Sequence, residues 1–280
     1  MASNNRENLL LRTTERWQPP AFSPADTRSR RVIAAARRFF DLQAASIWRD
    51  LSAVLPGARG LLVDVGCGAQ PYRGLLSADT RYLGLDIYGA DEGFGYSMPV
   101  VRRFAEGGPW PVDDASADVV LATETLEHVA DPGQFVAEAR RVLLPGGRLI
   151  ITVPFAARWH YIRHDYWRFT PSGLRLLLEG AGFEQLVVHA RGNERTVACY
   201  KALALLLPLV LPQRERGRSR VRLAGLLLAP VMVLLGALGN LSLRGGEGDD
   251  CLGYTATAVA APEPLRTEWG LTTPSPAEWP

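Results

Sequence analysis

The sequence has few cysteines and little net charge, and each shortage argues against a class of protein. Only three cysteines occur among 280 residues, Cys67, Cys199 and Cys251, and none forms a C-x-x-C pair. An odd number without paired spacing argues against a disulfide framework and a structural zinc site, and indicates reduced thiols in the cytosol. The net charge is +2, from 31 basic and 29 acidic residues. We therefore expect no nucleic-acid partner.

Phosphate-binding loops are also absent from the sequence. No G-x-x-x-x-G-K-[ST] segment occurs, and the turn that contains Gly66 and Gly68 lacks the third glycine of a dinucleotide fingerprint. No basic residue lies in this turn, and Asp64, two residues before it, would repel a pyrophosphate. S-adenosylmethionine has a ribose and two cationic groups but no phosphate, so the turn favours this cofactor.

A strand and a second acid support a nucleoside site. The apolar run 61–63 leads through Asp64 into the glycine turn, which is typical of a buried parallel strand that ends at a ligand. Asp86 lies about twenty residues further on, at the end of another apolar run. A carboxylate at that place can accept hydrogen bonds from both hydroxyls of a ribose.

Five motifs then carry a resemblance to a known family. They are D-x-GCG-x-x-PY at 64–72, Asp86 at a strand end, EHV-x-DP at 127–132, L-x-PGG ending at 147, and DYWRFTP at 165–171. In this order they resemble the class I S-adenosylmethionine-dependent methyltransferases, of the bacterial type 11-like kind, over about residues 58–190. The resemblance implies a Rossmann-like α/β fold, with a mostly parallel seven-stranded sheet and helices on both faces. An apolar helical insertion is expected before the last strand.

The resemblance and the strand ends together assign a cofactor site. Ligands of such sheets bind outside the carboxyl ends of the strands, where Thr123 and Glu124 follow the strand over 118–123. Glu106 precedes the Trp110-Pro111 turn, where the family often has an adenine-contacting acid; an exposed loop carboxylate is the alternative. The residues expected to bind S-adenosylmethionine are Asp64, Gly66, Gly68, Asp86, Glu106, Thr123 and Glu124.

Candidate catalytic residues lie in loops at the same edge. His128, His160 and His164 are three of only four histidines, and one of them can serve as the general base that a poorly nucleophilic acceptor needs. Solvated or helix-capping roles are the alternative. Asp165, Tyr166 and Arg168 are expected to form a wall of the acceptor site, with a local Asp165–Arg168 ion pair as the alternative. No metal is expected, because His160 and His164 have no third ligand near them in sequence.

Both ends of the chain are expected to lie outside the folded domain. Residues 1–30 are polar and contain three prolines, which predicts a disordered segment. The polar residues near the start interrupt any apolar core that a signal peptide would need, so no signal peptide is expected. Helical spacing of apolar residues over 31–55 predicts a helix before the first strand. The domain is expected over 31–261, followed by a proline-rich flexible tail over 262–280.

An apolar insertion over 197–246 interrupts the end of the domain. Residues 202–212 are apolar, five arginines follow between 214 and 222, and 223–243 contain no charge. Twenty-one helical residues would span about 31 Å, enough to cross a bilayer. Pro230 and the return of the chain to the same sheet argue against crossing. We expect a helical hairpin that either covers the active site or contacts anionic lipid through 202–243, with a buried lid as the alternative.

The expected function is methyl transfer from S-adenosylmethionine to a small-molecule, glycan or lipid-linked acceptor. The apolar insertion also makes a lipid or quinone acceptor at the membrane a hypothesis. Localisation is expected to be cytoplasmic, with contact at the inner face of the membrane. Two other hypotheses remain: a methyltransferase-like fold without catalysis that serves as a membrane-docked binding partner, and a NAD-dependent oxidoreductase. The absent third glycine counts against the last of these.

Overall fold

The computed structural model describes residues 27–90, 101–160, 164–210 and 218–262. The predicted disordered segment over 1–30 and the predicted tail over 262–280 therefore lie almost entirely outside the described residues. The strands are β1 (Gly60–Val65), β2 (Thr80–Ile87), β3 (Arg102–Phe104), β4 (Ala117–Thr123), β5 (Leu143–Pro154), β6 (Phe183–Ala190) and β7 (Gly253–Ala260). The helices are α2 (Arg28–Phe40), α3 (Leu42–Val54), α5 (Pro132–Val142), α6 (Pro171–Gly180), α7 (Glu194–Val210) and α8 (Arg218–Ser242).

The strands form one seven-stranded sheet in the order β3-β2-β1-β4-β5-β7-β6. All neighbours pair in parallel except β7, which is antiparallel to both β5 and β6. The chain moves outward from β1 to β3 and then returns to the other side of β1 with β4. Such a reversal of direction opens a crevice for a ligand at the carboxyl ends of β1 and β4. The predicted mostly parallel seven-stranded sheet is confirmed.

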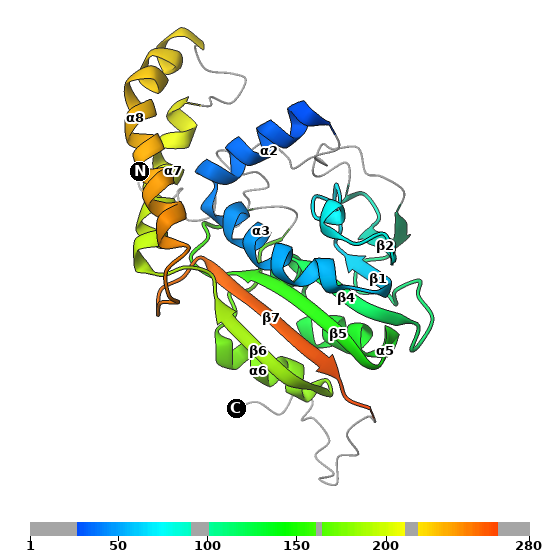
Figure 1. Cartoon of the computed structure of the whole chain (residues 1–280). Helices are drawn as coiled ribbons and strands as arrows, with labels where there is room; N and C mark the ends of the chain where they lie inside the picture. The colour runs from blue at the N-terminus through cyan, green and yellow to red at the C-terminus, as the bar shows by residue number, and fades with distance from the viewer. Residues whose placement is uncertain (1–26, 91–100, 161–163, 211–217, 263–280) are drawn as a thin grey trace, which may run out of the picture.

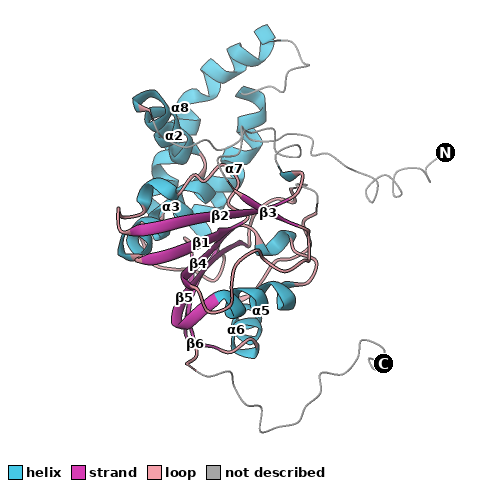
Figure 2. Cartoon of the chain, turned by 90° about the vertical axis from the view of Figure 1, so that its right-hand side faces the viewer, coloured by secondary structure: helices cyan, strands magenta, loops and turns pink. Residues whose placement is uncertain are grey.

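The two faces of the sheet are covered by different helices (Figure 2). Val63 packs on the side of α5 and α6, in a core that also holds Phe135 and Leu174. Leu62, its neighbour on β1, packs on the opposite side with Ile47 of α3. Alternate side chains of a strand point to opposite faces, so the continuous apolar run of β1 is buried on both sides.

Helix starts follow local capping signals. Asp131 is the N-cap of α5 and accepts a hydrogen bond from Gln134 N, and Pro132 occupies the first turn. Thr170 caps α6 in the same way and is followed by Pro171. A side-chain acceptor and a proline suit the first turn because its backbone N–H groups have no partner within the helix.

The predicted helix over 31–55 is two helices, which corrects the sequence interpretation. Asp41 separates α2 from α3, with an extended backbone and a side chain that accepts a hydrogen bond from Ala44 N. Helix α2 begins at Arg28, where Thr27 accepts from Arg30 N, so residues 28–30 are helical rather than part of a disordered segment. Apolar periodicity survives a kink of this kind, which is why it did not reveal the break.

The insertion is a helical hairpin, as expected. Helices α7 and α8 lie side by side, and α8 also contacts α2 and α3. Figure 1 shows the hairpin extending beyond the body of the sheet, beside α2. In the described part of the chain one helical segment is long and apolar enough to cross a membrane, Gly225–Ser242, and 22% of it is buried. The hairpin therefore exposes many apolar side chains, while Leu203 and Met232 are buried in a cluster with Leu42 of α3.

Candidate active site

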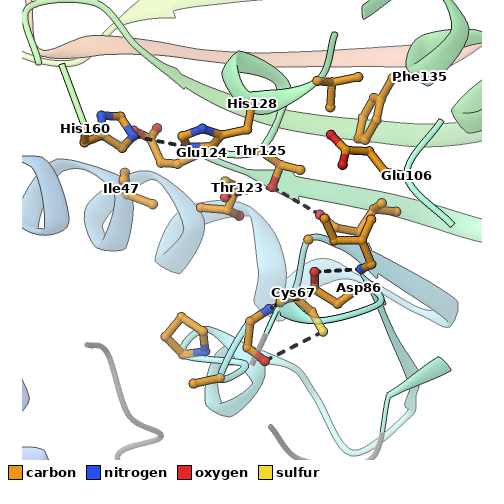
Figure 3. A pocket seen from close by; sticks show the side chains of 18 of the residues that line it. Ile47, Cys67, Asp86, Glu106, Thr123, Glu124, Thr125, His128, Phe135 and His160 are labelled. Carbon is orange, nitrogen blue, oxygen red and sulfur yellow. Dashed lines mark hydrogen bonds between the residues drawn. The ribbon is translucent and has the colours of Figure 1, made fainter. Parts of the chain in front are cut away.

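A cavity of about 800 Å³ opens at the carboxyl ends of β1, β2 and β4, beneath α3. Figure 3 shows side chains from these loops pointing toward one another across it. The structure brings most of the predicted site residues to its wall: Gly66, Gly68, Asp86, Glu106, Thr123, Glu124, His128 and His160. Asp64, His164, Asp165, Tyr166 and Arg168 are not among the lining residues.

The glycine turn is shaped by positive φ angles and by Asp86. Gly66 has a φ of 71°, and a Cβ added there would lie 2.5 Å from Thr125 Oγ1. Gly68 has a φ of 49°, and its backbone N–H donates to Asp86 Oδ2 at 3.0 Å. Glycine is required at Gly66 for both its conformation and the close approach. The two glycines thus expose backbone to the cavity, while Cys67, which lies between them in sequence, also lines it.

Asp64 lies behind the turn and away from the cavity. Its Oδ2 accepts a hydrogen bond from the Tyr82 hydroxyl at 2.6 Å. Burial raises the pKa of Asp64 to about 7; the Tyr82 hydroxyl lowers it and the charge of Asp86 raises it further. The structure does not bring this acid to the wall where the sequence placed it, and a direct contact with the cofactor stays a prediction.

Glu124 is held at the cavity edge by a buried arginine that sequence reasoning missed. Arg191 is 0% exposed, and its Nη2 donates to Glu124 Oε1 at 2.8 Å and to the Val153 carbonyl at 2.9 Å. Glu124 has a φ of 48°, in the left-handed region. Arg191 follows β6 in a part of the sequence without a motif, so no local signal could have paired it with Glu124.

Two of the predicted histidines meet in the cavity. The Nε2 atoms of His128 and His160 lie 3.1 Å apart, and Figure 3 shows the two rings facing each other beside Glu124. Burial, followed by the nearby His160, lowers the pKa of His128 to about 4. His128 is therefore neutral near pH 7. His164 is not on the wall; its backbone carbonyl accepts from His128 Nδ1.

Glu127 belongs to the EHV-x-DP motif, but the sequence analysis predicted no role for its side chain. Its side chain is 0% exposed, and its Oε1 lies 3.5 Å from His128 Nε2 and 3.9 Å from His160 Nε2. Burial, followed by the charge of Glu124, raises the pKa of Glu127 well above its usual range. Glu127, His128 and His160 are also a set of side chains that could hold a metal ion.

The residues of the predicted acceptor wall contact the histidine cluster, and their contact with an acceptor stays a prediction. Asp165 Oδ2 accepts from the backbone N–H of His160 at 3.0 Å and from Arg168 Nη2 at 2.8 Å. Burial alone would raise the pKa of Asp165, but the hydrogen bonds from Arg168 and His160 more than offset it and lower the pKa. The backbone N–H of Tyr166 donates to the Glu127 carbonyl at 2.8 Å. The local Asp165–Arg168 pair, considered as the alternative, is present.

Residues from the helical layer complete the cavity. Arg37 of α2, Asp41 between α2 and α3, and Tyr200 of α7 also line it. None of these was predicted to be a site residue. Tyr200 lies far from the other lining residues in sequence, and only the packing of α7 brings it to the site. The cavity therefore extends from the glycine turn to the hairpin.

Comparison with known proteins identifies the family. Residues 63–151 match the model of a methyltransferase domain. The ubiquinone biosynthesis O-methyltransferase of Cereibacter sphaeroides is 35% identical over 170 residues, which cover 50% of this chain and 67% of that protein. The enzyme of the same name from Ruegeria pomeroyi is 34% identical over 165 residues, 49% of this chain and 64% of that protein. The chain belongs to the class I S-adenosylmethionine-dependent methyltransferases.

This membership makes the protein an enzyme with S-adenosylmethionine as its methyl donor. Among solved structures, phosphoethanolamine N-methyltransferase 2 of Haemonchus contortus with S-adenosyl-L-methionine has a TM-score of 0.46 and 13% identity, covering 77% of this chain and 53% of that one. A likeness of that size carries no argument about function. The residues present fit the cofactor, because the glycine turn and the Asp86 carboxylate face one cavity.

Proposed function

We propose that this enzyme transfers the methyl group of S-adenosylmethionine to a hydroxyl oxygen of an apolar acceptor at the membrane. The observation that carries the proposal is the single cavity, which joins the glycine turn to the paired histidines His128 and His160. The names of the relatives, ubiquinone biosynthesis O-methyltransferases, supply hydroxylated quinone precursors as an example of such an acceptor.

The donor half of the cavity is assigned by its polar groups. Asp86 would accept hydrogen bonds from the ribose hydroxyls, and Gly66 and Gly68 would let the methionine part approach the backbone. Glu106 also lines the cavity and would contact the adenine ring. Thr123 and Glu124 lie between this half and the histidines, where the sulfonium has to be placed for transfer.

The chemistry needed from the protein is modest. As the oxygen–carbon bond forms, the carbon–sulfur bond breaks, and its electron pair stays on sulfur to give S-adenosylhomocysteine. Holding the oxygen in line with the methyl group can supply about 7–11 kcal/mol. A hydroxyl is a poor nucleophile until its proton is lost, so the cluster of Glu127, His128 and His160 is assigned to activation of the acceptor oxygen.

The hairpin supports an acceptor dissolved in lipid at the cytoplasmic face of a membrane. Leu226 and Leu227 of α8 are 74% and 73% exposed. Over 195–246 the sequence holds Glu215 as its one acid, against five arginines between 214 and 222. Apolar side chains insert into the interface while basic groups are attracted to anionic lipids. Tyr200 of α7 lines the cavity, so the hairpin would bring the site close to the lipid phase.

Methyl transfer to separated acceptor classes tests the proposal. Labelled S-adenosylmethionine is supplied with the full chain and one acceptor at a time: a hydroxylated aromatic ring with an apolar tail in vesicles, the same ring without its tail, and a soluble glycan. We expect label in the tailed acceptor, as an O-methyl group, and less in the tail-free ring. Labelling of the glycan alone, or of nitrogen, would overturn the proposed acceptor.

A further inference from the structure

The paired histidines of the cavity approach each other through their Nε2 atoms, which lie 3.1 Å apart. His128 Nδ1 lies within hydrogen-bond distance of the His164 carbonyl, and His160 Nδ1 lies 3.2 Å from the Arg158 carbonyl. A carbonyl only accepts, so an Nδ1 that bonds to one carries a proton. In a histidine with its proton on Nδ1, Nε2 is the atom that can bind a metal ion.

A buried carboxylate adjoins this pair. Neither carboxylate oxygen of Glu127 has a hydrogen-bond partner in the described part of the chain, and the side chain is completely buried. Burying a carboxylate without a partner is costly. Its Oε1 lies 3.5 Å from His128 Nε2 and 3.9 Å from His160 Nε2. Three side chains that can each supply one ligand atom to a cation therefore converge on one point.

We propose that Glu127, His128 and His160 bind a divalent transition-metal ion. Their ligand atoms all lie within 4.8 Å of one another. A four-coordinate zinc ion with bonds of about 2.1 Å holds its ligand atoms about 3.4 Å apart, and the three separations observed are 3.1, 3.5 and 3.9 Å. Two imidazoles and a glutamate are a ligand set that catalytic zinc sites use with a fourth position left open.

The surroundings of the cluster hold the ligands in the orientation that a metal needs. Metal-binding histidines donate their other N–H to a carbonyl or carboxylate, as His128 does to the His164 carbonyl. His160 Nδ1 lies near the Arg158 carbonyl and 3.4 Å from Asp165 Oδ2. Asp165 is itself held by Arg168. The DYWR segment thus orients the ligands of the proposed metal site.

The open position faces the cavity. His128 and His160 line it, whereas Glu127 lies behind the wall. A hydroxyl oxygen bound to the metal from the cavity side would lose its proton to water more readily, because a bound cation lowers the pKa of its ligand. This role rests on the proposed O-methyl transfer, but the binding of the metal does not.

Metal titration of the full chain tests the inference. The protein, freed of any affinity tag and stripped with a chelator, is titrated with Zn²⁺ by calorimetry and with Co²⁺ by visible absorption. We expect one equivalent of either ion to bind. Glu127→Gln and His160→Gln should each weaken binding by at least about 100-fold, and Asp165→Asn by about tenfold. Each variant must still bind S-adenosylhomocysteine, which shows that it is folded.

His164→Gln is the matched control for metal binding. It removes a nearby imidazole but leaves the backbone carbonyl that orients His128, so Zn²⁺ affinity should match that of the unmodified chain. Absence of stoichiometric binding, or unchanged affinity in Glu127→Gln and His160→Gln, would overturn the metal site. Methylation of the tailed acceptor by metal-free protein at full rate would also overturn its role. A bound metal without any hydroxyl methylation would instead refute the proposed function alone.

Discussion

Asp86 shows how one side chain can shape a turn and remain available to a ligand. Its Oδ2 accepts from Gly68 N at 3.0 Å and its Oδ1 from Ile87 N at 2.9 Å, while the residue lines the cavity. A carboxylate has about four acceptor sites, so a carboxylate that holds the backbone can also accept from ribose hydroxyls. The same residue therefore positions the glycine turn and is the candidate partner of the ribose.

Replacing Asp86 by alanine should weaken binding of S-adenosylhomocysteine by about 100-fold. Hydrogen bonds to a charged group contribute about 1.5–3 kcal/mol each, and about 2.7 kcal/mol corresponds to a hundredfold in the dissociation constant. Calorimetric titration measures the change. Asp113→Ala, which removes an exposed loop acid, is the matched control and should bind normally. Equal affinities for both variants would show that Asp86 does not contact the cofactor.

Gly66→Ala should destabilise the protein by about 1–3 kcal/mol, because the new side chain combines a left-handed backbone with a steric clash. The added Cβ would lie 2.5 Å from Thr125 Oγ1. Urea unfolding with and without S-adenosylhomocysteine measures the loss. Gly246→Ala introduces a Cβ that meets no atom within 4 Å and should leave the midpoint unchanged. A Gly66→Ala variant as stable as the parent would contradict the required conformation.

At the scale of elements, α3 is anchored to the far edge of the sheet by a buried acid. Asp50 Oδ2 accepts from the Thr255 hydroxyl on β7 at 2.7 Å, and it lies 3.0 Å from His189 Nε2 on β6. Burial alone would raise the pKa of Asp50, but the hydrogen bonds from His189 and Thr255 more than offset it and lower the pKa to about 2. The helix that roofs the cavity is thus tied to two strands.

This anchor predicts a loss of stability in acid. The pKa of Asp50 is lower in the folded state than in the unfolded state, so its stabilisation is present above about pH 4 and disappears as the pH falls toward 2. The contribution is about 2 kcal/mol. Urea midpoints measured between pH 5 and pH 2 should fall less steeply for Asp50→Asn than for the parent chain. Parallel curves would contradict the anchor.

The whole molecule presents one side that is apolar and basic. Helix α2 contains five arginines and no acid, exposes Val32 and Ile33, and contacts α8. Helix α8 exposes leucines along most of its length; the exposed large ones are Leu223, Leu226, Leu227, Leu234, Leu238 and Leu241. This side lies across the sheet from α6 (Figure 2). It is therefore the side that would face a membrane.

Vesicle sedimentation tests that surface. Leu226→Glu combined with Leu227→Glu should reduce pelleting with anionic vesicles by more than about tenfold, because each buried leucine contributes about 1.5–3 kcal/mol. Leu176→Glu on α6 is the control, since Leu176 is 76% exposed but lies on the other side. Binding of the parent chain should also fall with added salt. Identical pelleting of the double variant and the parent would refute membrane contact.

Much of the fold was predictable because its signals are local. Asp131-Pro132 and Thr170-Pro171 start helices through contacts within four residues of the chain. Alternating strands and helices imply a parallel sheet whatever the rest of the chain does. The break at Asp41 was missed, because an apolar stripe continues across it and only the backbone angles reveal the second helix start.

The residues of the candidate site were likewise predictable only where their signals are local. Gly66, Gly68 and Asp86 were predictable, because a turn and a strand end fix their positions and their chemistry suits a nucleoside. The predicted roles of Asp165 and Arg168 on an acceptor wall were not supported by their positions. Whether a side chain faces the cavity or supports the wall depends on how the following loop packs, and spacing in sequence does not specify this.

The sequence by itself determined the order of the elements, the family and the methyl donor, because these depend on periodicity, caps and a short motif. Only the tertiary structure decided which side chains meet. Glu124 pairs with Arg191 across 67 residues, and His128 faces His160 across 32 residues. Parallel strands bring the loops at their carboxyl ends to one edge. Side chains that are distant in the chain therefore become neighbours there, and a buried carboxylate such as Glu127 acquires partners that no local pattern encodes.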